Sequence, residues 1–381
     1  MKTFVKNGMV YRNHCFQKAD IQIDDGKIQT IGPNLFEEGS TLVDGTGMWV
    51  VPGFIDIHTH GADGVDVNAA TGEDFEKICR FQARQGTTSW LASVLTDTKE
   101  QTLWCIEQYN RWKQGEKKGA HLMGIHLEGP FLSTEYKGAM PEHLLQKPNT
   151  DLVREYQKAA GGDIRYLTIA PELEGAISFI SQMKELGIVV SIGHSAASYE
   201  TAMEAIKAGA ASSTHTGNAM KLLHQRFPAI WGAALESDTL YCEMICDGLH
   251  LHPGVIRLTI KAKGLDKVVA VTDSIMAAGL PDGNYKLGVN DVVVKDGDAK
   301  LAGKENRAGS TLTTGKALKN LLSFTGKSLE EILPLLTENP ARLLGVYDRI
   351  GSIEEGKDAD LVLLDQKLEV CETMVKGLCV L

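Results

Sequence analysis

The sequence predicts an α/β protein: a (β/α)8 TIM-like barrel of the metallo-hydrolase type, with a small β-sandwich domain formed by both chain ends. Two observations from the middle of the chain predict the barrel. Helical patterns at residues 74–85, 174–186 and 199–208 alternate with short apolar segments, which is typical of βα units and a parallel sheet. No Gly-x-Gly-x-x-Gly motif follows an early strand, which disfavours a dinucleotide-binding fold. A third observation, strand-like segments without helices at both ends, predicts the smaller domain.

The two ends of the chain have the same character. Short strand-like segments span residues 9–11, 19–23, 27–31, 359–365 and 372–377. Asp24-Asp25-Gly26 separates two of them and is a strong hairpin signal. We therefore expect residues 1–52 and 346–381 to combine into one small β-domain, with the rest of the chain inserted between them.

The inserted part, residues 53–345, has the length of a barrel. About 290 residues are sufficient for eight βα units, and apolar strands are expected at 122–127, 189–193 and 268–272. An open, doubly wound sheet is the alternative arrangement of such units.

Composition excludes several classes of partner. The 381 residues are 43% hydrophobic and 23% charged, which is ordinary for a soluble globular protein. The net charge is −10 without a long basic run, so nucleic acid is not expected as a partner. The N-terminus lacks a signal-peptide core and no apolar run reaches about 18 residues, so no membrane span is expected. The chain has seven cysteines, an odd number, and no Cys-x-x-Cys motif. This disfavours a disulfide framework and favours a reducing, cytoplasmic location.

A pair of histidines follows the apolar segment that begins the inserted part. His58 and His60 are one residue apart, so on a β-strand their side chains lie on the same face. Two imidazoles on one face can share a metal ion, although a lone His-x-His is a weak signal.

Further candidate strands end in residues that can bind metal, namely Glu128, His194, His215 and Asp273. The carboxyl ends of barrel strands converge at one mouth, so these groups and the two histidines are expected to meet in one pocket. Imidazole and carboxylate groups suit zinc, and also iron, manganese or cobalt. Asp273 could cap a helix that starts at Ser274, either in place of metal binding or together with it. His126 could support the site without binding the metal.

Together these residues resemble the amidohydrolase superfamily, and within it the N-acetylglucosamine-6-phosphate deacetylases. The resemblance extends over nearly the whole chain and rests on Pro52-Gly53-Phe54-Ile55-Asp56, Leu127-Glu128-Gly129-Pro130-Phe131, Gly193-His194-Ser195, Thr214-His215 with Asn218-Ala219-Met220, Asp247-Gly248-Leu249-His250, Thr272-Asp273 and Ala308-Gly309-Ser310-Thr311-Leu312. It implies hydrolysis of the acetamide of N-acetyl-D-glucosamine 6-phosphate in amino-sugar catabolism and cell-wall sugar recycling.

The resemblance also implies roles for particular residues. Glu128, His194 and His215 would hold the main divalent metal, most simply zinc or iron, and His58 with His60 would hold a second ion. Asp273 would be the catalytic residue. Substrate contacts would come from Ala139, Met140, Asn218, Ala219, His250 and Arg226. A homodimer is implied, in which Arg226 reaches the phosphate of the amino sugar in the neighbouring subunit.

One position departs from the family pattern. The family commonly has a histidine after the Lys-Gly pair, where this chain has Met140, and His143 lies three residues further on. Methionine cannot donate a strong hydrogen bond, so N-acetylgalactosamine 6-phosphate is an alternative substrate. A cyclic-amide hydrolase is disfavoured because no lysine ends a comparable strand. A barrel scaffold without catalysis is disfavoured by the complete set of candidate ligands.

Overall fold

The central element is a parallel sheet that curves into a barrel. A computed structural model describes residues 2–380. In chain order the barrel strands are β6 (Phe54–Thr59), β9 (Thr87–Leu95), β10 (His121–Glu128), β11 (Ile164–Ile169), β12 (Val189–Ile192), β13 (Ser212–Ser213), β14 (Tyr241–Ile245) and β15 (Val268–Val271). Each strand pairs with the next in parallel register.

Backbone hydrogen bonds close the barrel between its first and last strands. Just beyond β15, the amide of Asp273 donates to the carbonyl of His58 at 2.8 Å, and the amide of His60 donates to the carbonyl of Ser274 at 2.7 Å. The predicted (β/α)8 barrel is thus confirmed, and the open doubly wound sheet is excluded.

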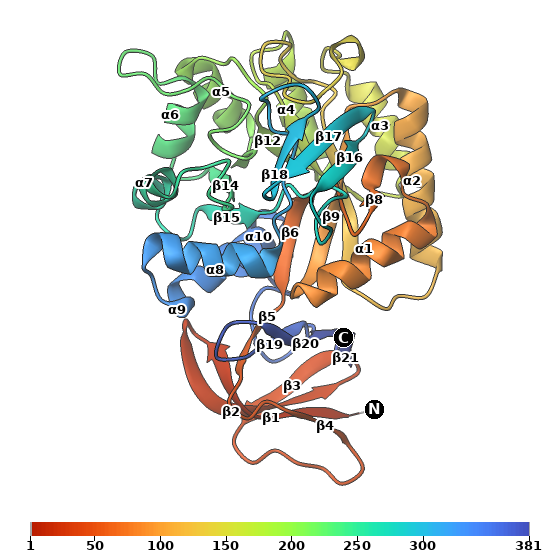
Figure 1. Ribbon diagram of the computed structural model, residues 1–381, viewed down its shortest axis with the longest axis vertical. Coiled ribbons are helices and arrows are strands. Elements are labelled where there is room, and N and C mark those ends of the chain that lie inside the picture. Colours follow the sequence, from red (N-terminus) through yellow and green to blue (C-terminus); the bar gives the residue numbers. More distant parts are fainter. Residues whose placement is uncertain (1, 381) are drawn as a thin grey trace.

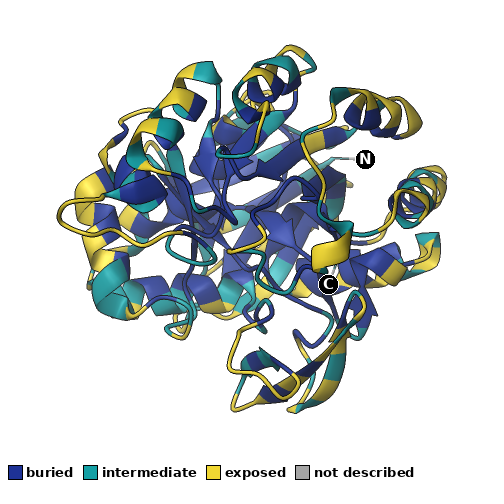
Figure 2. Cartoon of the chain, turned by 90° about the horizontal axis from the view of Figure 1, so that it is seen from above, coloured by how far each residue is buried: buried dark blue, intermediate teal, exposed yellow. Residues whose placement is uncertain are grey.

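Helices surround the barrel (Figure 1). They are α1 (Gly72–Arg84), α2 (Lys99–Gln114), α3 (Thr150–Ala159), α4 (Ala176–Glu185), α5 (Tyr199–Ala208), α6 (Ala229–Glu236), α7 (Pro253–Lys263), α8 (Thr314–Thr325), α9 (Leu329–Ile332) and α10 (Glu338–Leu343), with short 3-10 helices η1 (Val67–Ala69), η2 (Glu142–Leu144) and η3 (Leu333–Leu336). Seen from above, buried strands occupy the middle, and the helices expose their outer faces (Figure 2).

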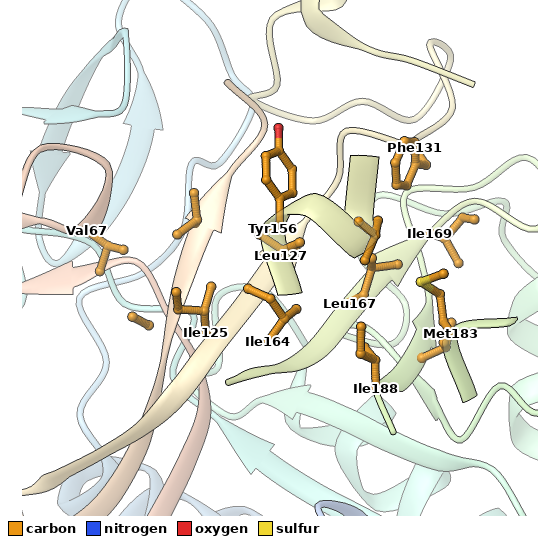
Figure 3. Close-up of a cluster of buried hydrophobic side chains, with 14 of the residues drawn as sticks. Val67, Ile125, Leu127, Phe131, Tyr156, Ile164, Leu167, Ile169, Met183 and Ile188 are labelled. Atoms are coloured by element: carbon orange, nitrogen blue, oxygen red, sulfur yellow. The ribbon is translucent and has the colours of Figure 1, made fainter. Parts of the chain in front are cut away.

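Alternation along the strands separates an apolar layer from a polar one. On β10, Ile125 and Leu127 join the apolar cluster beneath the helices (Figure 3). Their neighbours His126 and Glu128 take part in polar contacts inside the barrel. This period of two allows one buried strand to serve both the core and the site.

A second sheet combines both ends of the chain. Its strands are β1 (Thr3–Arg12), β2 (Cys15–Asp24), β3 (Lys27–Gly32), β4 (Thr41–Asp44), β5 (Trp49–Pro52), β19 (Leu361–Leu364), β20 (Val370–Val375) and β21 (Leu378–Cys379). β19 pairs with β5, so the C-terminal strands lie beside the N-terminal ones (Figure 1). The expected hairpin is present, because β2 ends at Asp24 and β3 begins at Lys27.

Two predicted strands are too short, because β1 begins six residues before the predicted segment 9–11 and β2 begins four residues before the segment 19–23. The other predicted helices and strands end within two residues of the observed ones. Between the two sheets the chain passes from β5, which ends at Pro52, directly to β6, which begins at Phe54. The division of the chain at residues 52/53 and 345/346 stays a prediction.

Two small sheets were not predicted. β16 (Gly283–Leu287), β17 (Asn290–Lys295) and β18 (Asp298–Leu301) form an antiparallel sheet, and Figure 1 shows it in front of the barrel. β7 (Gly61–Ala62) and β8 (Val65–Asp66) form a short hairpin after β6. Among residues 2–380, no helix has the length and apolar character needed to span a membrane.

Candidate functional site

Six side chains with metal-binding groups meet where the barrel strands end. They are His58, His60, Glu128, His194, His215 and Asp273. All six are buried, with exposed fractions from 0% for His58 to 8% for Asp273. The structure therefore brings together every metal-binding candidate that the sequence indicated.

The carboxylate of Glu128 lies between two pairs of imidazoles. His58 Nε2 is 3.2 Å from His60 Nε2, and His194 Nε2 is 3.1 Å from His215 Nε2. Glu128 Oε1 is 3.2 Å from the Nε2 atoms of both His194 and His215, while its Oε2 is 3.2 Å from His60 Nε2. This position allows Glu128 to contact one ion in each half of the cluster.

The spacing of these atoms fits a metal centre. Tetrahedral bonds of about 2.0–2.1 Å place ligand atoms about 3.3–3.4 Å apart. The separations of 3.1–3.2 Å in the Glu128–His194–His215 group are close to that value. The group of His58, His60 and Asp273 is less even, because the carboxylate lies 3.2 Å from His60 Nε2 but 3.5 Å from His58 Nε2. The donor set therefore fits one ion well, with room for a second.

Three of the four imidazoles are oriented by an acceptor at Nδ1. His60 faces the carbonyl of Ser93 at 2.9 Å and His194 that of Tyr136 at 2.9 Å. His58 faces Glu243 Oε2 at 3.1 Å. With the proton on Nδ1, each Nε2 presents its lone pair to the cluster, as in metal-binding histidines. His215 Nδ1 has no hydrogen-bond partner within the described part of the chain.

The charges in the cluster call for a cation. Burial disfavours protonated His58 and His60, but Glu128 and Asp273 outweigh it and raise the pKa of His58 well above its usual value and that of His60 to about 9. Burial alone would raise the pKa of Glu128, but the histidines lower it well below its usual range. Two buried carboxylates thus require positive charge beside them, which a metal ion can supply in place of protons.

The backbone is strained where three of these groups leave their strands. His194, His215 and Asp273 have φ values of +46°, +31° and +50°, in a region that residues other than glycine rarely adopt. Such conformations cost of order 1–3 kcal/mol each and cluster at functional sites. This backbone conformation turns the three side chains into the mouth of the barrel. No helix begins at Asp273, so its alternative role as a helix cap is wrong.

A buried glutamate that was not predicted supports the cluster. Glu243 on β14 has no exposed surface. Besides His58, it accepts from the amide of His215 at 3.2 Å and from the hydroxyl of Tyr166. The available signal was a charged residue within an apolar strand segment, which needs partners when buried.

Asp56 is a second supporting carboxylate that was not predicted. It accepts from the Thr272 hydroxyl at 2.6 Å and from the His58 amide at 3.3 Å. Complete burial raises its pKa to about 6. Asp56 thus connects the first barrel strand to the segment that carries Asp273.

His126 stands beside the cluster without joining it. Its Nδ1 is 2.8 Å from Ser93 Oγ and its Nε2 is 2.9 Å from Thr168 Oγ1, so neither nitrogen is free for a metal. Its ring packs edge-on against His58, with centroids 4.6 Å apart. This placement agrees with a supporting role.

A cavity of about 350 Å³ opens above the cluster. Its lining includes the predicted substrate contacts Ala139, Met140, Asn218, Ala219 and His250. Asp247 holds His250 Nδ1 at 2.7 Å and also caps the turn by accepting from two backbone amides. Nε2 is therefore the ring nitrogen of His250 left for a substrate.

The loop that carries Ala139 and Met140 lies tightly between the metal cluster and the small sheet. A Cβ atom on Gly138 would lie 3.0 Å from the His194 ring. Asn290 on β17 donates to the carbonyl of Ala139 at 2.9 Å. Met140 is 3% exposed and packs against apolar residues of β16–β18. His143 is exposed and does not line the cavity, so it does not replace the missing ring donor.

Arg226 lies outside the cavity of its own chain. It is exposed on the loop between β13 and α6 and is absent from the cavity lining. Its neighbours Leu222, Leu223 and Phe227 expose 59%, 49% and 66% of their surface. The structure thus does not bring Arg226 together with the other candidates within one subunit.

Comparisons with known proteins agree with this geometry. Residues 49–380 match the amidohydrolase family. An N-acetylglucosamine-6-phosphate deacetylase of Bacillus subtilis (strain 168) is 36% identical over 374 residues, covering 97% of this chain and 94% of the relative. An N-acetylgalactosamine-6-phosphate deacetylase of Escherichia coli O157:H7 is 32% identical over 360 residues, covering 94% and 93%.

A solved structure extends the similarity to the whole fold. The crystal structure of N-acetylglucosamine-6-phosphate deacetylase from Pasteurella multocida superposes with a TM-score of 0.93 at 31% identity, covering 99% of each chain. With a family match over most of the chain and relatives of nearly equal length, the chain belongs to the amidohydrolase family and, within it, to the N-acetylglucosamine-6-phosphate deacetylases.

Proposed function

We propose that the protein hydrolyses the acetamide of N-acetyl-D-glucosamine 6-phosphate to D-glucosamine 6-phosphate and acetate. The observation that carries this proposal is the buried cluster of four imidazoles, Glu128 and Asp273 below the cavity. A divalent ion held there, zinc or iron being the best suited, would polarise the amide carbonyl and lower the pKa of an attacking water.

Asp273 is the proton-transfer group in this proposal. Its Oδ1 lies 3.2 Å from His60 Nε2, and its side chain reaches the cavity floor. Burial opposes ionisation of Asp273, but His58 and His60 outweigh it and lower the pKa of the carboxyl. An ionised Asp273 accepts a proton from the attacking water and returns it to the leaving amine.

The remaining cavity residues orient the sugar. The side-chain amide nitrogen of Asn218 donates to the backbone carbonyl of His215 at 3.0 Å. The side-chain oxygen of Asn218 is therefore left for a sugar hydroxyl. His250 is held rigidly by Asp247, so its Nε2 can contact the substrate without a further loss of side-chain freedom. Ala219 and Ala139 line the cavity, where their backbone groups and small side chains would contact the sugar.

The phosphate is bound by Arg226 of a second subunit. The position of Arg226 on an exposed apolar loop, away from its own cavity, supports this proposal. A homodimer would bury Leu222, Leu223 and Phe227 and carry the guanidinium to the neighbouring site, where it can form a bidentate contact with phosphate. The protein would work in the cytoplasm on this small anionic sugar.

A direct assay tests the substrate. Acetate release is measured with N-acetylglucosamine 6-phosphate, with its galactosamine epimer, and with both unphosphorylated sugars. The proposal predicts the highest kcat/KM for N-acetylglucosamine 6-phosphate, with a large loss when the phosphate is removed. Equal rates with and without phosphate would contradict the role of Arg226, and no acetate release from any sugar would contradict the activity.

N-acetylgalactosamine 6-phosphate is the second candidate because of Met140. An apolar, buried side chain stands where the family commonly has a hydrogen-bonding ring, which weakens selection of one sugar hydroxyl. A higher kcat/KM for the galactosamine epimer in the same assay would favour this alternative.

A further inference from the structure

A second cavity lies at the opposite end of the barrel from the metal cluster. It has a volume of about 470 Å³. Its walls come from α2, the start of β10, the start of β11, the segment after α10, and the C-terminal strands. His121, at the start of β10, lines this cavity, whereas Glu128 ends the same strand in the metal cluster. Seven residues of strand separate the two by about 23 Å, so a ligand here would not touch the metal cluster.

The side chains that line this cavity are mostly positive, whereas the molecule as a whole is negatively charged. The chain carries a net charge of −10, but the cavity is lined by five basic side chains and one acidic side chain, Asp163. The basic ones are Lys113, Lys117, Arg165, Arg349 and Lys376.

Two of the basic side chains form ion pairs with Asp163. Lys113 and Arg165 bind its carboxylate at 2.6 Å and 2.9 Å. Lys117 donates to the carbonyls of Trp112 and Gly115. Arg349 and Lys376 are exposed, and their side chains form no ion pair or hydrogen bond with any residue from 2 to 380. These two charges are the ones free to bind an anion.

The ionisable groups near Arg349 and Lys376 do not neutralise their positive charge. Burial, together with the nearby charges of Lys376 and Arg349, lowers the pKa of His121 to about 4, so the imidazole is neutral at physiological pH. Asp358, whose charge acts on His121 but which does not line the cavity, is paired with Lys27 at 2.5 Å. Asp360 is buried, and burial raises the pKa of its carboxyl to about 7, so it is only partly ionised.

The rest of the cavity wall is apolar. Leu122 and Trp112 are 1% and 4% exposed, and Leu344, Val346 and Val375 add aliphatic surface. Sites for small organic ligands are typically about 300–1,000 Å³, mostly apolar, with a few placed polar groups. We propose that this cavity binds a small organic phosphate monoester, with the phosphate on Arg349 and Lys376 and the organic part against the apolar wall.

Calorimetry with a simple probe tests this site, and every protein in the series carries Arg226→Ala so that the proposed phosphate contact of the active site does not contribute. The probe is phenyl phosphate, with inorganic phosphate and phenol as its two halves. We expect saturable binding of phenyl phosphate, tighter than either half and weakened by salt, because screening reduces charge attraction. The double variant Arg349→Gln/Lys376→Gln should bind about ten- to a hundredfold more weakly, as expected for lost charge-assisted contacts.

Control variants separate the site from a general effect of charge. Lys207→Gln/Lys304→Gln removes two exposed charges elsewhere and should leave binding unchanged, while Arg349→Lys/Lys376→Arg should retain most of it. Thermal unfolding confirms that each variant folds. Equal binding by the Gln double variant and the control, binding of phenol as tight as that of phenyl phosphate, or no saturable binding would each overturn the proposal.

Discussion

At the scale of single residues, Asp273 has the clearest consequence. Asp273→Asn keeps the shape of the side chain but removes the proton acceptor, so kcat should fall by a factor on the order of 10² to 10⁴. The metal content should stay near that of the wild type, because the group of Glu128, His194 and His215 is complete without Asp273. Parallel measurement of turnover and bound metal checks both statements, and near-normal turnover would show that another group transfers the proton.

Replacing different metal ligands should reduce the amount of bound metal to different extents. His194→Ala or His215→Ala leaves two protein ligands in the tighter group, so most bound metal should be lost. His58→Ala should remove less, because His58 belongs to the less even group, in which it lies 3.5 Å from Asp273 Oδ1. Elemental analysis of the purified variants decides the matter. Full metal in the His194 variant would contradict the ligand assignment.

At the scale of elements, strand alternation explains why much of the site could be predicted. His58 and His60 share a face because a strand repeats every two residues, and barrel geometry brings the other strand ends to them. Glu243 escaped prediction because its partners, His58 and Tyr166, lie on strands far away in sequence. The sheet β16–β18 escaped because its short strands lie within a region expected to contain only βα units.

The joint between β19 and the turn after β20 should respond to pH. Asp360 precedes β19, is 6% exposed, and accepts from the Lys376 amide at 2.7 Å. Burial raises its pKa to about 7, against about 3.9 in an unfolded chain. The folded state therefore holds the extra proton between these values. Its contribution to stability is complete below about pH 4 and is lost as the pH rises through about 7.

Asp360→Asn mimics the protonated carboxyl and should remove this loss. The variant should gain of the order of 2 to 4 kcal/mol in unfolding free energy relative to the wild type at about pH 8, and little at about pH 4. Urea unfolding at both pH values measures the difference. A gain of the same size at both would show that Asp360 does not titrate in this range.

At the scale of the whole molecule, the account requires two subunits for each complete site. Arg226→Ala should raise KM mainly, since the phosphate is remote from the reacting bond. When Arg226→Ala subunits exchange with Asp273→Asn subunits, each mixed dimer has one site that lacks both groups and one that lacks neither. At low substrate concentration, activity should then recover to about a quarter of the wild-type value. If Arg226 acted within its own subunit, mixing would restore nothing.

The central claim is that the buried cluster binds a metal that amide hydrolysis requires. The most direct measurement follows acetate release from N-acetylglucosamine 6-phosphate by one preparation in three states: as purified, after removal of metal by a chelator, and after re-addition of zinc or iron. We predict that activity disappears with the metal and returns in proportion to the metal rebound, reaching its full value at one or two ions per subunit. Undiminished acetate release by protein shown to be free of metal would contradict the account.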